Sequence, residues 1–198
     1  MRKVILQEFM TLDGFAAGPN NNVDFIPAST AGDQKLGREQ TELLAGVDTI
    51  LLGRATYDMF VGYWPNVPEG DEKAFADKLN ATPKLVFSRK LDRAPWGKWD
   101  DAKIVRSSPT DEVAKLKKQS GKDLVVWGSL SIAQALMAAD LIDEYRLVIC
   151  PVVLGTGKPL FKDETLARRL KVLNALTMDR GAVQMKCVPE EAHSAVRG

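Results

Sequence analysis

The chain has 198 residues, 45% hydrophobic and 27% charged, the size and composition of one globular domain. Its 27 basic and 26 acidic residues leave a formal net charge of +1, so no field of one sign favours nucleic acid or an anionic membrane. No apolar run approaches the roughly 20 residues that cross a bilayer, and the single histidine excludes a multi-histidine metal site. We therefore expect a soluble cytoplasmic protein with no metal, with a small molecule as its ligand.

Short runs of Val, Ile and Leu alternate with longer amphipathic stretches in the first half of the chain, which predicts strands and helices in alternation. The expected elements are a strand at 4–10, a polar loop at 13–27, a helix at 32–47, a strand at 49–52, helices at 54–60 and 72–79, and a strand at 84–87.

The second half continues this pattern and then changes to strands alone. Thr110 is a plausible N-cap for a helix that runs to about residue 119, and Gly121 is its expected C-cap. Ser129 is a natural N-cap for a second helix. The expected elements are a strand at 103–105, the helix from 110, a strand at 124–127, a helix at 129–139, and strands at 144–154, 171–178 and 182–188. Asp179-Arg180-Gly181 predicts a tight hairpin between the last two strands.

Repeated β-α units with continuous apolar strands predict a sheet that is covered by helices on both faces. We expect a single three-layer α/β (αβα) sandwich over residues 1–189, with a mixed sheet and a C-terminal antiparallel hairpin. A polar tail at 190–198, which contains His193, follows it. Ligands of such sheets bind outside the carboxyl ends of the strands, so three strand ends are candidates for a site.

The first of these strand ends has Gly53 as its last residue, with Arg54 and Thr56 in the helix that follows. Amides at a helix start and the positive end of the helix dipole bind anions, and a glycine lets a phosphate approach the main chain. The structural alternative is that Gly53 permits a tight turn and Arg54 is solvated. The sequence favours neither the anion site nor the plain turn.

The other two strand ends carry hydroxyl groups. The strand at 124–127 continues into Gly128, Ser129 and Leu130, where Ser129 can cap the helix or bond a pyrophosphate oxygen. The strand at 84–87 is followed by Ser88 and Arg89, and arginine makes strong hydrogen bonds to phosphate. A glycine and a serine at a strand end, or a basic pair on a loop, also occur as plain turns and solvated surface.

Five segments follow one another in an order that is specific as a set. They are Thr11-Leu12-Asp13-Gly14-Phe15, Gly53-Arg54-Ala55-Thr56-Tyr57, Ser88-Arg89, Trp127-Gly128-Ser129 and the run PVVLGTGKPLF at 151–161. The series resembles the dihydrofolate reductase-like superfamily. More closely, it resembles the C-terminal reductase domain of the bifunctional riboflavin-biosynthesis deaminase-reductase, over about residues 4–188.

This resemblance implies a dihydrofolate reductase-like sheet whose C-terminal edge holds substrate and cofactor, and it implies a homodimer. By the family's pattern the cofactor is NADPH, and its site would be lined by Gly53, Arg54, Thr56, Ser88, Arg89, Gly128, Ser129 and Leu130. In that arrangement Arg54 or Arg89 would meet the 2′-phosphate that distinguishes NADPH from NADH.

The chain also departs from the patterns that it resembles. The riboflavin reductases usually carry a lysine six residues before the aspartate of their S-L-D-G motif, and this chain has Gln7 there. The dihydrofolate reductases keep an acid early in their first helix, where this chain offers Asp33 and Glu39 without a matching motif. The sequence therefore does not name the substrate.

Two acids in the loop after the first strand are candidates for catalysis. Asp13 could relay a proton or anchor the substrate, and Asp24 is the second candidate. The alternative for Asp13 is a turn-forming role before Gly14, because Asp-Gly is a common turn pair. Five aromatic residues could wall a pocket for a planar ring or belong to the core: Phe15, Phe25, Tyr57, Phe60 and Trp64.

The function that we expect is an NADPH-dependent reductase, which transfers a hydride to a small heterocyclic (pterin- or pyrimidine-like) or carbonyl substrate. The alternative, from a different class, is a nucleotide-binding protein of the same fold without catalytic activity. A pure protein-interaction domain would leave the two glycine-ended helix starts unexplained.

Overall fold

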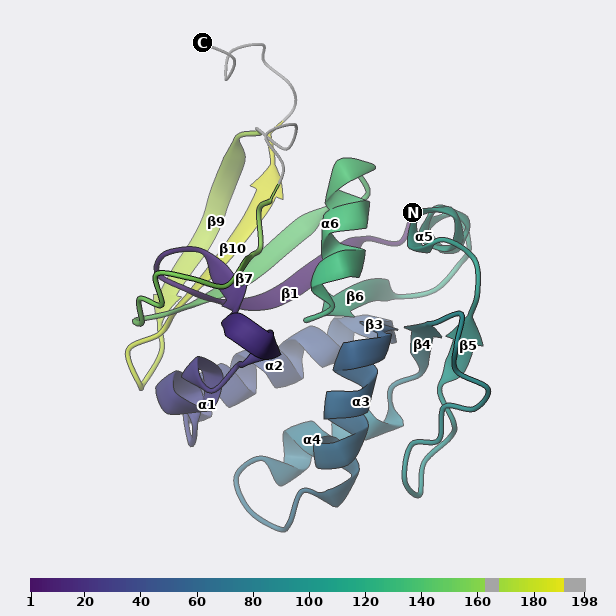
Figure 1. Cartoon of the computed structure of the whole chain (residues 1–198), viewed down its shortest axis with the longest axis horizontal. Helices are drawn as coiled ribbons and strands as arrows, with labels where there is room; N and C mark the ends of the chain where they lie inside the picture. Colours follow the sequence, from purple (N-terminus) through teal and green to yellow (C-terminus); the bar gives the residue numbers. More distant parts are fainter. Residues whose placement is uncertain (163–167, 191–198) are drawn as a thin grey trace.

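The computed structural model describes residues 1–162 and 168–190, and a single eight-stranded sheet runs through them (Figure 1). Its strand order is β5-β4-β3-β6-β1-β7-β10-β9. The strands are β1 (Val4–Thr11), β3 (Val47–Gly53), β4 (Lys84–Phe87), β5 (Lys103–Val105), β6 (Asp123–Trp127), β7 (Glu144–Cys150), β9 (Leu170–Thr177) and β10 (Val183–Pro189). A small second sheet pairs β2 (Phe15–Ala17) with β8 (Lys158–Pro159).

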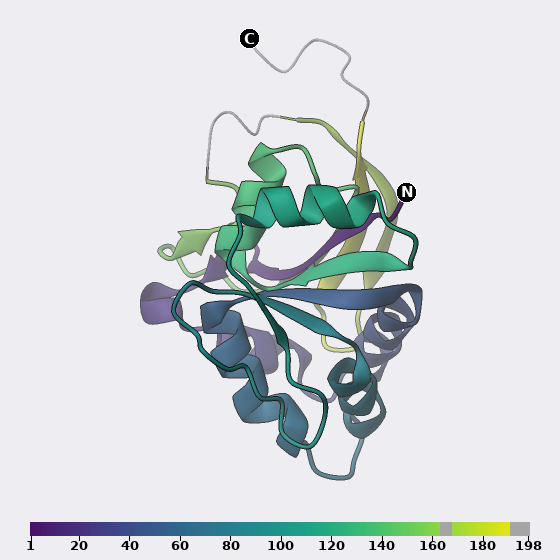
Figure 2. The same cartoon turned by 90° about the vertical axis from the view of Figure 1, so that its right-hand side faces the viewer.

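Helices cover both faces of the large sheet. Those in the described ranges are α1 (Phe25–Thr30), α2 (Gln34–Gly46), α3 (Arg54–Tyr63), α4 (Lys73–Ala81), α5 (Pro109–Lys117) and α6 (Leu130–Ala138), with short 3-10 turns η1 (Pro19–Asn21) and η2 (Trp64–Asn66). Figure 2 shows α5 and α6 on one face and α2, α3 and α4 on the other. The three-layer architecture is therefore confirmed.

The strand β1 lies near the middle of the sheet, parallel to β6 on one side and to β7 on the other. Its side chains alternate between two cores, as in any strand. Leu6 packs in the cluster that contains Leu136 of α6, whereas Ile5 packs with Leu43 of α2 on the opposite face. The hairpin of β9 and β10 completes the mixed sheet through an antiparallel pairing of β10 with β7.

Several predicted boundaries were wrong, for local reasons. The loop expected at 13–27 contains β2 and η1 and leads into α1. Helix α5 is capped by Ser108, whose Oγ accepts from Asp111 N at 3.1 Å, and not by Thr110, because Pro109 supplies the first helical position. This helix ends at Lys117, before the glycine that we expected to cap it, and β7 ends at Cys150, because Pro151 has no amide for the ladder.

The remaining sequence-based expectations concern the end of the chain and its surroundings. The polar tail, with His193, lies outside the described residues except for Glu190, whose amide donates to Arg169 O at 3.0 Å. Both cysteines, Cys150 and Cys187, are free and buried. Within residues 1–162 and 168–190, no helix is both long and apolar enough to span a membrane.

Candidate functional site

The turns that follow β3, β4 and β6 meet at one edge of the sheet, because these strands are parallel and in register. Leu51 pairs with Val126, and Gly53 pairs with Phe87. A cavity of about 1560 Å³ opens at this edge. Most of the predicted cofactor residues line it, namely Gly53, Arg54, Thr56, Gly128, Ser129 and Leu130. Ser88 follows Phe87 at the same edge, but neither it nor Arg89 belongs to the lining.

The starts of α3 and α6 are joined by two hydroxyl groups. Ser129 Oγ accepts a hydrogen bond from Gly53 N at 2.7 Å, and Thr56 Oγ1 accepts one from Ser129 N at 3.2 Å. Ser129 precedes α6 with a positive φ of 24° and its side chain does not cap that helix, so the capping role expected for it was wrong. It ties one helix start to the other instead. The first-turn amides of two helices, which have no acceptor inside their own helix, therefore lie together.

Gly128 is the position in this wall where the conformation requires a glycine. Its φ is +69°, and a Cβ atom there would lie 3.3 Å from Thr56 Cγ2. Its amide donates to Gln7 O at 3.1 Å, which fixes the turn to β1. Gly53, by contrast, has an ordinary φ of −79°, so a tight turn is not the reason for that glycine. A bare main chain at Gly128 leaves room for a phosphate to approach.

The cations beside this wall have different surroundings. Arg54 lines the cavity, and its Nε lies 2.6 Å from Asp58 Oδ2, with both side chains about half exposed (50% and 49%). Arg89 is exposed, and its carbonyl accepts from Arg106 Nη1 at 2.9 Å. Ser88 Oγ accepts from Lys90 N and from Leu91 N, at 3.2 Å each, and so shapes this loop.

Asp13 ties two loops together at the surface. Its carboxylate accepts from Thr11 Oγ1 at 2.5 Å, from Gly155 N at 2.7 Å and from Leu154 N at 3.1 Å. The Thr11 hydroxyl and these amides hold the pKa of Asp13 below its ordinary value, so the carboxylate is the stable form. Asp13 does not line the cavity, and its bonds connect the turn after β1 with residues 154–155.

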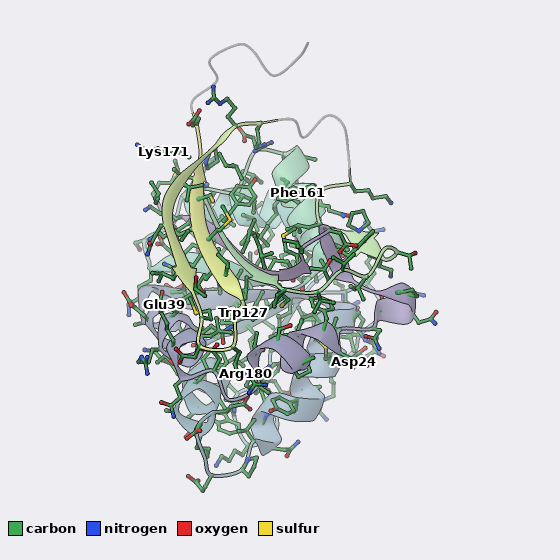
Figure 3. The ribbon with its side chains drawn as sticks, turned by 90° about the vertical axis from the view of Figure 1, so that its left-hand side faces the viewer. Asp24, Glu39, Trp127, Phe161, Lys171 and Arg180 are labelled. Atoms are coloured by element: carbon green, nitrogen blue, oxygen red, sulfur yellow. The ribbon has the colours of Figure 1, made fainter. Side chains whose placement is uncertain are left out.

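The other acids that the sequence offered are also bound to nearby polar groups. Asp24 is exposed and accepts from Asn22 Nδ2 at 2.6 Å, outside the cavity lining. Asp33 caps α2 through Leu36 N at 2.9 Å and accepts from Arg180 N of the hairpin at 2.7 Å. Glu39 accepts from Gln184, and Figure 3 shows it on the opposite side of Trp127 from Asp24. In the described parts of the chain, no three His, Cys, Asp or Glu side chains gather as a metal site would require.

Sequence reasoning missed one acid, Glu8 on β1. It is 5% exposed and lines the cavity, and its Oε1 accepts from Phe9 N at 3.0 Å. Burial raises the pKa of Glu8 well above 4.5, more than the Phe9 amide lowers it. The signal in the sequence was a single acid inside the run VILQEFMT, in which most of the other residues are apolar.

Aromatic side chains form another part of the cavity lining. Phe60, Trp64 and Phe75 line it, and the ring of Trp64 meets those of Phe60 and Phe75 edge-on at 6.0 and 5.1 Å. The remaining three candidate aromatics, Phe15, Phe25 and Tyr57, are outside the lining. Single-ligand pockets run from about 300 to 1,000 Å³. This cavity exceeds that range and has room for two molecules, one near the helix starts and one near the rings.

The sheet order, the closing hairpin and the helix starts along one edge define a protein of the dihydrofolate reductase-like class. The chain belongs, more narrowly, to the family of the RibD C-terminal domain, whose model matches residues 2–184. This is a family of reductase domains. The resemblance that the ordered motifs suggested is therefore confirmed.

Comparison with individual proteins gives the same assignment. The uncharacterized protein YyaP of Bacillus subtilis is 37% identical over 185 residues, which are 93% of each chain. A structure assigned to riboflavin biosynthesis in Shewanella sp. PV-4 matches with a TM-score of 0.74 and 22% identity, over 96% of this chain and all (100%) of the other. The deaminase and 5-amino-6-(5-phosphoribosylamino)uracil reductase of Thermotoga maritima matches at 0.63 and 14% identity, with 96% of this chain and 57% of that one covered. At these identities the two structures support the fold alone.

Proposed function

We propose that the protein is an NADPH-dependent reductase that acts on a small heterocyclic (pterin- or pyrimidine-like) or carbonyl substrate. The observation that carries the proposal is the pairing of two helix starts, through Ser129, Gly53 and Thr56, on one wall of a cavity large enough for two molecules. Helix starts with free amides bind phosphates. Membership of a family of reductase domains supports the same function.

The residues on this wall fit a dinucleotide. The first-turn amides of α6, from Leu130 on, would hold the pyrophosphate beside Ser129, because Gly128 keeps this side of the wall free of a Cβ atom. Arg54 or Arg89, which follow strands that end at the same edge, would hold the 2′-phosphate. The bound cofactor would supply a hydride, and the protein would orient the two reactants and exclude water. The aromatic end of the cavity would receive the ring of the substrate.

One observation favours the second candidate, a nucleotide-binding protein without catalysis. Gln7 stands where the riboflavin reductases usually have a lysine, and it is 1% exposed, with no hydrogen-bond partner for Nε2 among the described residues. It does not line the cavity. A phosphoribosyl substrate would therefore lack the cation that this position usually provides.

Turnover separates the two candidates. We expect the purified protein to oxidise NADPH in the presence of at least one member of a panel of dihydropterins, aminopyrimidinediones and cyclic carbonyl compounds. The loss of NADPH absorbance measures this oxidation. Tight NADPH binding without oxidation by any of them would support the catalytically inactive alternative. Absence of both binding and oxidation would exclude the two together.

Gly128→Ala tests the cofactor wall. The new Cβ atom meets Thr56 in a backbone conformation that costs side-chain-bearing residues about 1–2 kcal/mol. Gly155→Ala is the matched control, because Gly155 has a φ of +70° with nothing within 4 Å of the added atom, and it lies outside the cavity lining. We expect both variants to lose similar stability in urea unfolding, and only Gly128→Ala to bind NADPH more weakly by calorimetric titration. Equal affinities would contradict the pyrophosphate site.

Arg89→Ala tests the 2′-phosphate. Loss of a hydrogen bond to a charged group costs roughly 1.5–3 kcal/mol, so NADPH affinity should fall by about that amount, whereas NADH affinity should change little. The neighbouring Lys90→Ala removes the same charge from an exposed position and controls for long-range attraction. Fluorescence titration with each cofactor measures the difference. An equal loss for NADPH and NADH in Arg89→Ala would rule out the assigned contact.

We also propose that the protein acts as a homodimer in the cytoplasm. Strand β9 is at the sheet edge, and Val172 and Leu173 on it are each 49% exposed, an apolar edge of the kind that pairs with another chain. Light scattering should give twice the chain mass, and Leu173→Lys should give the single-chain mass. Leu12→Lys, at another exposed leucine, should remain dimeric. A monomeric wild type would contradict the homodimer.

The proposed cytoplasmic location is supported by the two cysteines. Free, buried cysteines suit the reducing cytoplasm.

A further inference from the structure

Glu8 adjoins the turn at which the two helix starts meet. The ladder between β1 and β6 ends where Gln7 pairs with Trp127, and the carbonyl of Gln7 accepts from the amide of Gly128 at 3.1 Å. Glu8 is the next residue on β1, and its side chain belongs to the lining of the same cavity as Gly128 and Ser129. Glu8 thus lies beside the proposed cofactor wall.

No cation neutralises this carboxyl group within the described ranges. Burial and the hydrogen bond from Phe9 N are the influences that act on it. The other charged residues that line the cavity come from α2, α3, α4 and the segments beside them, and from β8 and the residues after it: Asp33, Arg38, Glu42, Arg54, Asp71, Glu72, Lys78, Lys158 and Lys162. Arg54 is engaged with Asp58, and Lys158 with Asn21.

A buried carboxyl group without a counter-charge is more stable with its proton than without it. The pKa of Glu8 is accordingly raised well above 4.5 by burial. Oε1 is held by the Phe9 amide, so Oε2 is the oxygen that can carry the proton. A neutral acid kept in an apolar site can donate a hydrogen bond and then a proton to a reacting heteroatom.

We propose that Glu8 is the catalytic acid of this site, and that its protonated carboxyl group binds the oxygen or nitrogen of a cyclic C=O or C=N bond. The inference rests on the proposed reductase function and names its substrate class. As the reduced dinucleotide delivers a hydride to the carbon, Glu8 delivers its proton to the heteroatom. The double bond becomes a single bond, the dinucleotide is oxidised, and Glu8 regains a proton from water.

The site then selects a substrate by two contacts. The heteroatom of the reducible bond is directed to β1 by Glu8, and the rest of the ring lies toward the aromatic side chains of Phe60 and Trp64. A neutral acid accommodates a neutral, weakly basic heteroatom and gives no charge attraction to a phosphate-bearing substrate. This agrees with Gln7, which is buried and uncharged at the position where the riboflavin reductases have a lysine.

The first experiment measures the proton itself, with no substrate. Infrared spectra at pH 7 should contain the C=O stretch of a protonated carboxylic acid that is absent from Glu8→Gln. Glu112→Gln is the matched control, because Glu112 is a partly exposed glutamate on α5, outside the cavity lining, and its replacement should leave this band intact. An ionised Glu8 at pH 7 overturns the proposal, whether or not a substrate is known.

Unfolding against pH gives a second readout of the same group. Between the ordinary pKa of 4.5 and the raised value in the folded state, the unfolded chain releases a proton that the folded chain keeps. The urea midpoint of the wild type should therefore fall as the pH rises through this window, relative to that of Glu8→Gln. Parallel curves for the two proteins would show that the acid is not held neutral.

The third experiment uses whichever member of the substrate panel the wild type reduces. Glu8→Gln should lower kcat by about 10²–10⁴-fold while the dissociation constant for NADPH changes little, and Glu8→Asp should recover part of the rate. The wild-type rate should fall at high pH as Glu8 ionises, and Glu8→Gln should lack that fall. An unchanged kcat in Glu8→Gln overturns the proposal. A wild type that reduces no member of the panel counts against the reductase function, and the infrared result still decides the state of Glu8.

Discussion

The lateral alignment of the parallel strands β3, β6 and β1 is the constraint on which the whole site depends. Because these strands are in register, the turns that follow them meet: Gly53 N donates to Ser129 Oγ, and the carbonyl of Gln7 accepts from the amide of Gly128. A one-residue slip of β1 would turn Glu8 to the other face of the sheet. The apolar clusters on the two faces oppose that slip, because it would exchange Leu6 and Ile5 between them.

Much of the fold was predictable because its signals are local. Continuous apolar runs predicted the strands, and β4 and β5 have the expected bounds, 84–87 and 103–105. The glycine-ended turns predicted helix starts, and parallel strands bring such turns to one edge. The errors were in boundaries that depend on one backbone atom, such as the end of β7 at Cys150, where the next residue is a proline without an amide.

The site was less predictable because its bonds join residues far apart in the chain. Ser129 looked like a local helix cap, yet its hydroxyl binds Gly53, 76 residues away. Asp13 looked like a turn or a catalytic acid, and its carboxylate binds Gly155, which is 142 residues away. A hydroxyl or carboxylate can satisfy many donors, and the sequence does not say which of them the fold brings near. Glu8 escaped notice because its burial depends on elements that are distant in sequence.

The acids of this protein differ in what their surroundings offer. Asp13 receives hydrogen bonds from two amides and a hydroxyl, and Asp33 receives them from the amides of Leu36 and Arg180, so for both the carboxylate strengthens the structure. Glu8 receives a single amide, from the residue next to it. A leucine in its place would continue the apolar face of Leu6 and Met10 without the cost of a buried polar group. The fold alone therefore gives no reason for an acid at this position, and the cavity that it lines does.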